Sequence, residues 1–152
     1  MTLFTQKLNL NIIPRWIPIV LLIVALIGFA DATYLTVEHY LNKIPPCSIG
    51  GCETVLTSPY SQVFGIPVSL FGSIYYFVIV LTLFMYFDTK KEIFLRFPMT
   101  LSFLGMLFSL WFMIIMAFVI QAICPYCIVS AVTSTTIFIV SLYILVKFKI
   151  KI

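Results

Sequence analysis

The sequence is poor in charged residues. Of its 152 residues only 9% are Asp, Glu, Lys or Arg, whereas 62% are hydrophobic. This composition excludes an ordinary soluble globular domain, in which about a quarter of the residues are charged. It is typical of a chain that lies largely inside a lipid bilayer. We therefore expect an integral membrane protein with a single domain, residues 1–152.

The sequence also lacks the pattern of a removable secretory signal. Its first apolar run, from about Trp16 to Tyr40, is longer than the apolar core of such a signal, and no small-residue cleavage site follows it. The formal net charge of +4 does not indicate nucleic-acid binding, because the basic residues lie at the ends of the apolar runs. We expect no nucleic-acid partner.

Four apolar segments are long enough to cross a membrane, which takes about 20 helical residues. They run from about Trp16 to Tyr40, Pro67 to Phe87, Pro98 to Ile120 and Pro125 to Val146. The last two connections are short, so the helices that they join are antiparallel. The predicted fold is an all-α membrane protein, an up-down bundle of four transmembrane helices.

The basic residues are distributed unequally between the two ends of this bundle. One end has Lys7, Arg15, Lys90, Lys91, Arg96, Lys147, Lys149 and Lys151. Asp88 to Glu92, together with Arg96, is expected to form the charged connection between the second and third helices. Only Lys43 lies at the other end. Because basic residues are enriched in cytoplasmic loops, we predict a multi-pass plasma-membrane protein with both termini in the cytoplasm.

Two polar residues near the end of the first segment have several possible roles. Asp31, the one acid within an apolar run, lies about 22 Å along the helix from Trp16, nearer the far interface than the midplane. A proton relay or polar contact inside the bundle is one interpretation. An interfacial acid that bonds a hydroxyl or reaches outward is the other, and we adopt it for Asp31. His39 is expected to be an interfacial residue.

The motif Cys124-Pro125-Tyr126-Cys127 opens the fourth segment. Proline suits the first turn of a helix, and unpaired backbone N–H groups and the helix dipole there favour a negative charge. A Cys-X-X-Cys pair in this setting often has a depressed pKa, and the thiolate is the species that attacks a disulfide. By itself the motif fits a redox-active pair and a structural pair equally well.

A second cysteine pair, Cys47 and Cys52, lies in the long connection between the first two helices. We call this connection the lid loop and define it as residues 41–66. Pro45-Pro46 stiffens its start, Gly50-Gly51 permits a tight turn, and the residues from Cys52 to Ser58 can form a short helix that ends before Pro59. The predicted topology places all four cysteines at the extracytoplasmic face, where disulfides form and persist.

Three interpretations of the four cysteines compete. Four thiolates can bind zinc in a tetrahedral site, although such sites usually repeat the two-residue spacing within a soluble module. Two inert disulfides are a second possibility, although a disulfide across one helical turn closes almost no loop. The third is a relay of exchanging disulfides. A relay fits the arrangement of the two pairs, because one pair lies on a hinged loop that can reach an external protein and the other pair is fixed at the start of a helix. We expect no bound metal.

The order of these elements resembles the vitamin K epoxide reductase family. The resemblance rests on the segment from Cys47 to Gly72, which contains G-C-E-T-V-L-T-S-P-Y-S-Q-V-F-G-I-P-V-S-L-F-G, and on C-P-Y-C opening the last helix. It covers the four-helix core and is greatest to prokaryotic homologues. It implies an enzyme that oxidises a thioredoxin-fold partner, reduces a quinone such as menaquinone or ubiquinone, and so generates disulfides in exported proteins.

The resemblance also implies roles for individual residues. Cys47 exchanges with the partner, Cys52 passes electrons to Cys124, and Cys127 lies against the quinone. Three further residues match family positions at the quinone pocket or near it: Ser58, Phe71 and Gly72. Because no thioredoxin-like segment follows the last helix, the partner is expected to be a separate protein that meets the chain at the membrane, where the quinone pool lies.

Two positions depart from the vertebrate members. Val68 stands where they have an asparagine, and Ala131 where they have a tyrosine that helps to hold vitamin K. These departures argue against epoxide reduction and leave quinone reduction in place.

Two alternatives remain. One is the other bacterial membrane disulfide-oxidase family, in which the Cys-X-X-Cys pair precedes the widely spaced pair. The other is a non-catalytic membrane structural or interaction protein with passive disulfides.

Overall fold

Four long helices dominate the computed structural model, which describes residues 14–47, 51–91 and 93–148. They are α1 (Trp16–Tyr40), α3 (Val68–Thr89), α4 (Ile93–Ile114) and α5 (Pro125–Phe148). Each is long and apolar enough to cross a membrane, α4 together with the π-helical turn Ile115–Ile120 that follows it. Helices are expected here because, in lipid, the backbone N–H and C=O groups must be paired within the chain. The predicted all-α membrane fold is confirmed.

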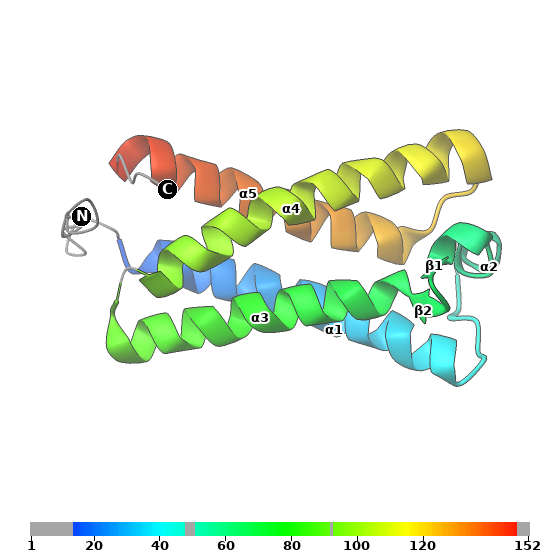
Figure 1. The fold of residues 1–152 in the computed structure, drawn as a ribbon, viewed down its shortest axis with the longest axis horizontal. Coiled ribbons are helices and arrows are strands. Elements are labelled where there is room, and N and C mark those ends of the chain that lie inside the picture. Colours follow the sequence, from blue (N-terminus) through cyan, green and yellow to red (C-terminus); the bar gives the residue numbers. More distant parts are fainter. Residues whose placement is uncertain (1–13, 48–50, 92, 149–152) are drawn as a thin grey trace.

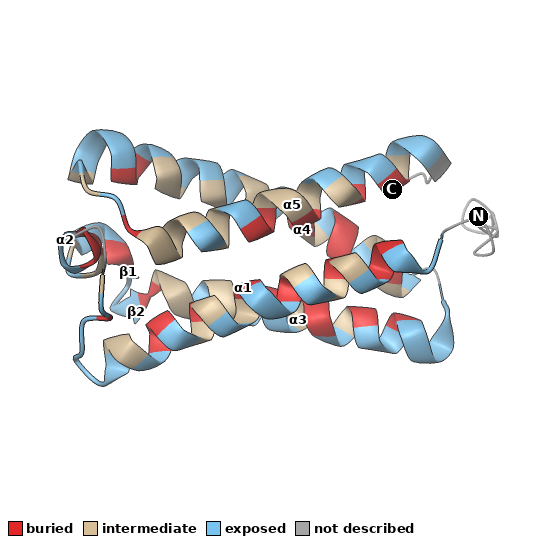
Figure 2. Ribbon diagram, turned by 180° about the vertical axis from the view of Figure 1, so that it is seen from behind, coloured by how far each residue is buried: buried red, intermediate tan, exposed pale blue. Residues whose placement is uncertain are grey.

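The helices form an antiparallel bundle in which each packs against two others. α1 contacts α3 and α5, and α4 also contacts α3 and α5 (Figure 1). Buried residues lie on the inner faces and exposed apolar residues on the outer ones (Figure 2). The main core lies along the inner faces, and Tyr76 of α3 crosses the bundle to donate a hydrogen bond to the Ser130 carbonyl of α5 at 2.7 Å. The apolar outer surface suits contact with lipid.

The predicted helix bounds hold at some ends and are wrong at others. α1 has the predicted limits, and α5 begins at Pro125 as expected. α4, however, begins at Ile93, so that Arg96 lies within the helix and not before it, and Pro98 lies inside the helix and not at its start. Pro98 removes one backbone hydrogen bond, a loss that membrane helices tolerate where neighbouring groups compensate. α3 also runs beyond Phe87, which shortens the charged connection; Glu92 of that connection is outside the described residues.

The lid loop is more structured than the sequence indicates. The expected short helix is present as α2 (Cys52–Leu56), and a 3₁₀ turn, Pro59–Ser61, follows it. An antiparallel pair, β1 (Gln62–Val63) and β2 (Ile66–Pro67), then leads into α3. Its turn residues Phe64 and Gly65 have φ values of 53° and 77°, as in the tight turns of hairpins. The pairing of β1 with β2 therefore fixes how the end of the lid loop leads into α3.

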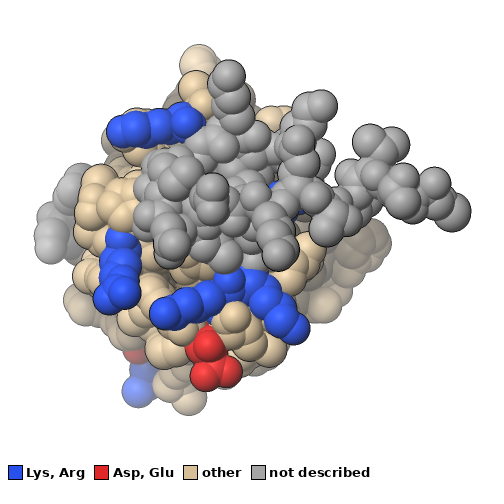
Figure 3. Space-filling model, turned by 90° about the vertical axis from the view of Figure 1, so that its left-hand side faces the viewer, with Lys and Arg blue, Asp and Glu red and all other residues tan. Residues whose placement is uncertain are grey.

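Basic residues gather at the end of the bundle opposite the lid loop. Arg15 precedes α1, Lys90 and Lys91 join α3 to α4, and Lys147 lies near the end of α5. Figure 3 shows Lys and Arg side chains around this end. Lys43 follows α1 at the lid end. The predicted orientation also depends on three lysines that lie outside the described residues, Lys7, Lys149 and Lys151.

Candidate functional site: two cysteine pairs beneath the lid loop

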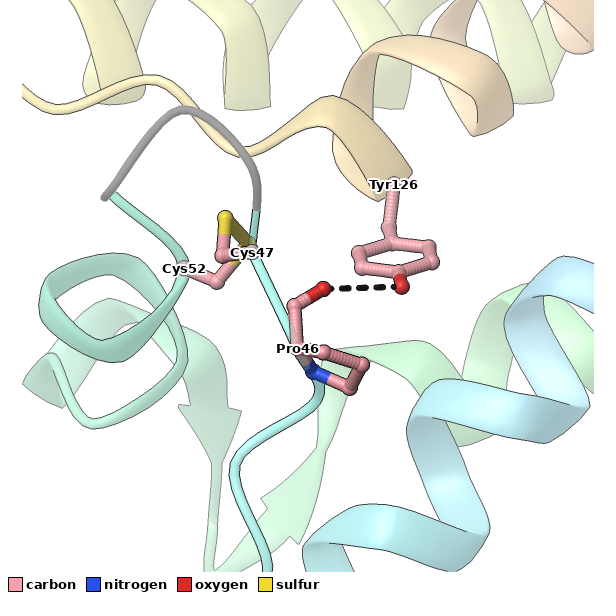
Figure 4. Close-up of a disulfide and its surroundings, with 4 residues drawn as sticks. All are labelled: Pro46, Cys47, Cys52 and Tyr126. Atoms are coloured by element: carbon pink, nitrogen blue, oxygen red, sulfur yellow. Dashed lines mark hydrogen bonds between the residues drawn. A yellow bond between two sulfur atoms is a disulfide. The ribbon is translucent and has the colours of Figure 1, made fainter.

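The lid loop carries a closed disulfide. Cys47 and Cys52 are bonded to each other, with their Cα atoms 6.0 Å apart. Cys52 is the first residue of α2 and is fully buried, whereas Cys47 is partly exposed (Figure 4). The disulfide therefore joins a partly exposed residue of the lid loop to a fully buried residue of the cysteine-containing core.

The second pair lies at the start of α5 as two free thiols. Cys124 immediately precedes the helix and is fully buried, and its carbonyl accepts a hydrogen bond from the N–H of Ile128 at 3.1 Å. Cys127 is in the first turn and is partly exposed. The helix starts at Pro125 because proline has no N–H to leave unpaired there.

All four cysteines belong to one packed cluster. Cys52, Val55, Met116 and Cys124 form its buried centre, and Cys47 and Cys127 pack against it. Two pairs that are far apart in sequence are thus joined by the fold. A closed disulfide leaves two thiols, fewer than the four thiolates of the zinc alternative, and no group of metal-binding side chains is found in residues 14–47, 51–91 and 93–148.

Gly51 lets the lid loop approach the chain that leads into α5. A Cβ atom at this position would collide with the Ile123 carbonyl oxygen and would lie 2.8 Å from the Ile123 nitrogen. The obstacle is backbone, which does not rotate away as a side chain would. Glycine at residue 51 therefore keeps Cys52 beside the cysteine pair of α5, a role beyond the turn expected from the sequence.

Tyr126, between the two cysteines of the motif, ties α5 to the lid loop. Its hydroxyl donates a hydrogen bond to the Pro46 carbonyl at 3.2 Å (Figure 4), and its ring packs on Tyr34 of α1 with centroids 5.6 Å apart. No role for Tyr126 was predicted from the sequence. The available signal was a polar aromatic residue between two cysteines, but its partner is 80 residues away.

The turn before the motif is also unusual. α4 continues into the π-helical turn Ile115–Ile120, and Gln121 then ends the helix with a φ of 54°. π-helical turns often occur at functional sites. Here the turn places Met116 in the cysteine cluster. No pattern in this apolar stretch distinguishes it from α-helix.

Cys124 is placed to ionise near neutral pH. Its pKa is lowered to about 7, chiefly because the Cys127 thiol donates a hydrogen bond to its sulfur, and the backbone N–H groups of Tyr126 and Cys127 act in the same direction. Burial and the negative charge of Asp31 oppose this effect. Cys124 can therefore exist as a thiolate and leave readily as one in disulfide exchange.

Alkylation of the reduced motif should show this ionisation. We expect the rate at which iodoacetamide modifies Cys124 to rise as the pH increases through about 7 and then to level off. Cys127→Ala removes the hydrogen bond and should move the midpoint upward, toward the ordinary thiol value of about 8.5. Peptide mapping would assign the modified residue. An unchanged midpoint in the variant would show that the hydrogen bond is not the cause.

The three other predicted site residues lie outside the cysteine cluster, as far as the described residues define it. The Ser58 hydroxyl bonds the Val55 carbonyl at 2.7 Å and so supports the end of α2. Phe71, in the first turn of α3, is 49% exposed. A Cβ at Gly72 would lie 3.5 Å from Ala32, so Gly72 faces α1.

A crevice of about 290 Å³ opens between α4 and α5. Its lining residues are Met113, Ile128, Ala131, Val132, Thr135 and Thr136. Ile128 directly follows the second cysteine of the motif, and Ala131 lies one turn further along α5. The crevice is mostly apolar and begins next to the cysteine pair.

Asp31 is partly exposed on α1. Its Oδ2 atom, however, is buried and has no hydrogen-bond partner among the described residues, so this oxygen does not accept the hydroxyl bond that the interfacial interpretation allowed. Its charge acts on both Cys124 and Cys127. His39 is partly exposed at the end of α1, with its Nε2 3.4 Å from Nε2 of Gln62 in the lid loop.

The chain matches the model of a known protein family. The family model described as "Vitamin K epoxide reductase family" matches residues 19–142, most of the chain. The matched range includes the whole lid loop and both cysteine pairs. A search of curated proteins found no match.

Proposed function

Because this chain belongs to the vitamin K epoxide reductase family, we propose that it oxidises a thioredoxin-fold partner and passes the electrons to a quinone. The family is one of membrane oxidoreductases linked to disulfide formation and quinones. Cys47 and Cys52 receive the electrons in this proposal, and Cys124 and Cys127 deliver them. The products are disulfides in exported proteins and a hydroquinone.

The observation that carries the proposal is the shared cluster of the two cysteine pairs. A disulfide relay requires an accessible sulfur, a buried sulfur of the same disulfide, and a thiolate beside the buried one. Cys47, Cys52 and Cys124 meet these three requirements. Passive disulfides would not need an adjacent thiol with a lowered pKa.

A series of disulfide exchanges carries two electrons from the partner to the cysteine pair of α5. The partner's two thiols attack the Cys47–Cys52 disulfide, so the partner becomes oxidised and the lid cysteines become thiols. Cys52 then attacks Cys124 of the Cys124–Cys127 disulfide and releases Cys127 as a thiolate. Cys47 attacks Cys52, which re-forms the lid disulfide and releases Cys124. The result is the state seen in the structure, with the lid pair oxidised and the α5 pair reduced.

The surroundings of Cys127 fit a quinone. A quinone ring and its isoprenoid tail are mostly apolar, and such ligands bind in apolar pockets with few polar contacts. When bound, a quinone accepts two electrons and two protons. We propose that it lies beneath the lid loop, bounded by Phe71 and Gly72 of α3 and by Cys127, with Ser58 supporting the loop above. Val68 and Ala131 offer the ring no polar contact, which favours quinone over epoxide as the substrate.

Phe71→Ala should weaken quinone use. Loss of an aromatic packing contact costs about 0.5–1.5 kcal/mol, which corresponds to an increase in the quinone KM of about 2- to 10-fold. Oxidation of the partner at saturating quinone should change little. Phe84→Ala is the matched control, because Phe84 lies on the same helix and is 55% exposed.

The crevice between α4 and α5 is an alternative quinone site, and a variant there can contradict the prediction for Phe71. Ala131→Phe would fill part of it. If that variant impaired quinone kinetics while Phe71→Ala kept them intact, the quinone would bind in the crevice and not beside Phe71.

The basic end of the bundle supports a cytoplasmic location for both termini (Figure 3). The lid loop and all four cysteines would then face the oxidising side of the plasma membrane. This orientation lets a separate thioredoxin-fold protein reach Cys47 from outside the cell membrane while quinone enters from the bilayer.

Quinone-dependent oxidation of a small dithiol by the purified protein tests the proposed function. We expect hydroquinone formation in proportion to the dithiol consumed. A protein with passive disulfides would give none. Either bacterial quinone-dependent enzyme would give turnover, so the order of the cysteine pairs and the family match distinguish those two.

A further inference from the structure

Asp31 contributes the one carboxylate oxygen among the buried polar atoms that lack a hydrogen-bond partner in the described residues. Its Oδ2 is buried and has no hydrogen-bond partner among the described residues. Ionisable side chains inside a transmembrane helix are costly to bury and usually face a functional site. A purely structural acid would be expected to accept a hydrogen bond, so the unpaired oxygen requires another explanation.

Neighbouring hydroxyl groups are already engaged elsewhere. Thr33 shares a hydrogen bond of 2.8 Å with Ser73 of α3, and Thr36 donates to the Ala32 carbonyl at 2.7 Å. The Tyr76 hydroxyl donates a hydrogen bond to the Ser130 carbonyl at 2.7 Å, and its oxygen lies 2.8 Å from the Thr133 hydroxyl oxygen. These bonds leave Asp31 Oδ2 free to accept a proton from another donor.

The groups that interact electrostatically with Asp31 identify that donor. They are Tyr76 on α3 and the two thiols, Cys124 before α5 and Cys127 within it. The one charged residue of α4, Arg96, lies in the first turn at the opposite end of the bundle. Since the proton of Tyr76 is committed to α5, the thiol pair is the remaining source.

We propose that Asp31 accepts the proton that leaves Cys127 when the cysteine pair of α5 is oxidised. This inference rests on the proposed function and assigns a residue to its proton transfer. Asp31 is suited to the task because its buried Oδ2 has no hydrogen-bond partner among the described residues and its charge acts on both cysteines.

Cys127, released as a thiolate in the exchange, takes up one of the two protons that the partner's thiols lose on oxidation. In the reactive pair Cys124 is therefore a thiolate and Cys127 is protonated. Formation of the Cys124–Cys127 bond releases two electrons, which go to the quinone, and one proton, which passes from Cys127 Sγ to Asp31 Oδ2. That proton leaves with the hydroquinone product and Asp31 is again ionised. The second proton of the product comes from water and replaces the one that Cys124 lost on ionising.

Asp31→Asn in the full-length protein tests the proposal, with quinone reduction by a small dithiol as the first measurement. General acid–base groups contribute about 10²- to 10⁴-fold to a rate, so kcat should fall by at least about 10²-fold. Asp31→Glu keeps a carboxyl group and should retain most of the rate. Glu38→Gln is the matched control, because it removes another acid from the same helix and should leave kcat unchanged.

A second measurement does not depend on quinone. The negative charge of Asp31 raises the pKa of Cys124, so Asp31→Asn should move the alkylation midpoint of Cys124 below about 7. Glu38→Gln should leave it in place. A merely structural role of Asp31 would lower thermal stability in the Asn and Glu variants alike and would not move this midpoint in the stated direction.

The outcomes separate the two claims. If the wild-type protein does not reduce quinone, the proposed function fails. If it does, and Asp31→Asn keeps its full kcat or Asp31→Glu loses as much rate as Asp31→Asn, this inference alone is overturned. An alkylation midpoint in Asp31→Asn that stays at the wild-type pH would also overturn it.

Discussion

Cys127→Ser is expected to lower the rate of quinone reduction by at least about 10³-fold, because serine cannot form the disulfide that yields two electrons. The loss should appear with the protein partner and with a small dithiol alike, since both routes end at the α5 pair. The measurement is the initial rate of hydroquinone formation by purified protein.

Ser130→Ala is the matched control for this prediction. Ser130 lies one turn beyond Cys127, and its carbonyl, not its hydroxyl, accepts the Tyr76 hydrogen bond. The control should keep the wild-type rate. If Cys127→Ser retained substantial quinone reduction, the α5 pair would not be the electron donor.

Cys47→Ser should separate the two halves of the reaction. We expect oxidation of the protein partner to fall by at least about 10²-fold, because the accessible sulfur of the lid disulfide is lost. Quinone reduction by a small dithiol should stay within about twofold of wild type, because such a molecule can reduce the α5 pair directly. Parallel assays with the two reductants measure the difference.

Glu53→Gln controls for a general disturbance of the lid loop, since Glu53 is exposed and directly follows Cys52. It should affect neither assay. Equal losses in both assays for Cys47→Ser would contradict the division of labour between the two cysteine pairs.

The membrane helices could be predicted because their main determinant is local. A run of about 20 apolar residues must pair its own backbone groups in lipid, and helix is the result. The third helix shows where this reasoning fails. Pro98 is its predicted start, yet the helix begins at Ile93, because a proline near a helix end interrupts the hydrogen bonds only locally.

The lid loop illustrates the limit of local patterns. Its short helix follows from the spacing of Cys52 and Pro59, but the hairpin turn uses Phe64-Gly65, not the usual Asn-Gly, and gives no strong signal. The close approach of Gly51 to Ile123 joins residues 72 positions apart, as the numbering shows. Such a contact depends on the packing of the whole bundle.

The placement of the four cysteines could be predicted, but their surroundings could not. The cysteine spacing and the charge distribution indicated that both pairs lie at the same end of the bundle, where the structure packs them in one cluster. The setting of Asp31 was not predictable, because it depends on which hydroxyl groups of α1 and α3 bond one another and on the placement of α5. Tyr126 was missed for the same reason, as its partner Pro46 is brought near only by the folded lid loop.

Disulfide mapping of the double variant Cys47→Ser/Cys127→Ser tests the central claim, that Cys52 exchanges with Cys124. Only these two cysteines remain, so neither the lid disulfide nor the α5 disulfide can form. Under mild oxidation we predict an intramolecular Cys52–Cys124 bond as the main species. The matched variant Cys52→Ser/Cys127→Ser, which leaves Cys47 and Cys124, should form little. Free thiols in the first variant, or a bond only in the second, would contradict the relay.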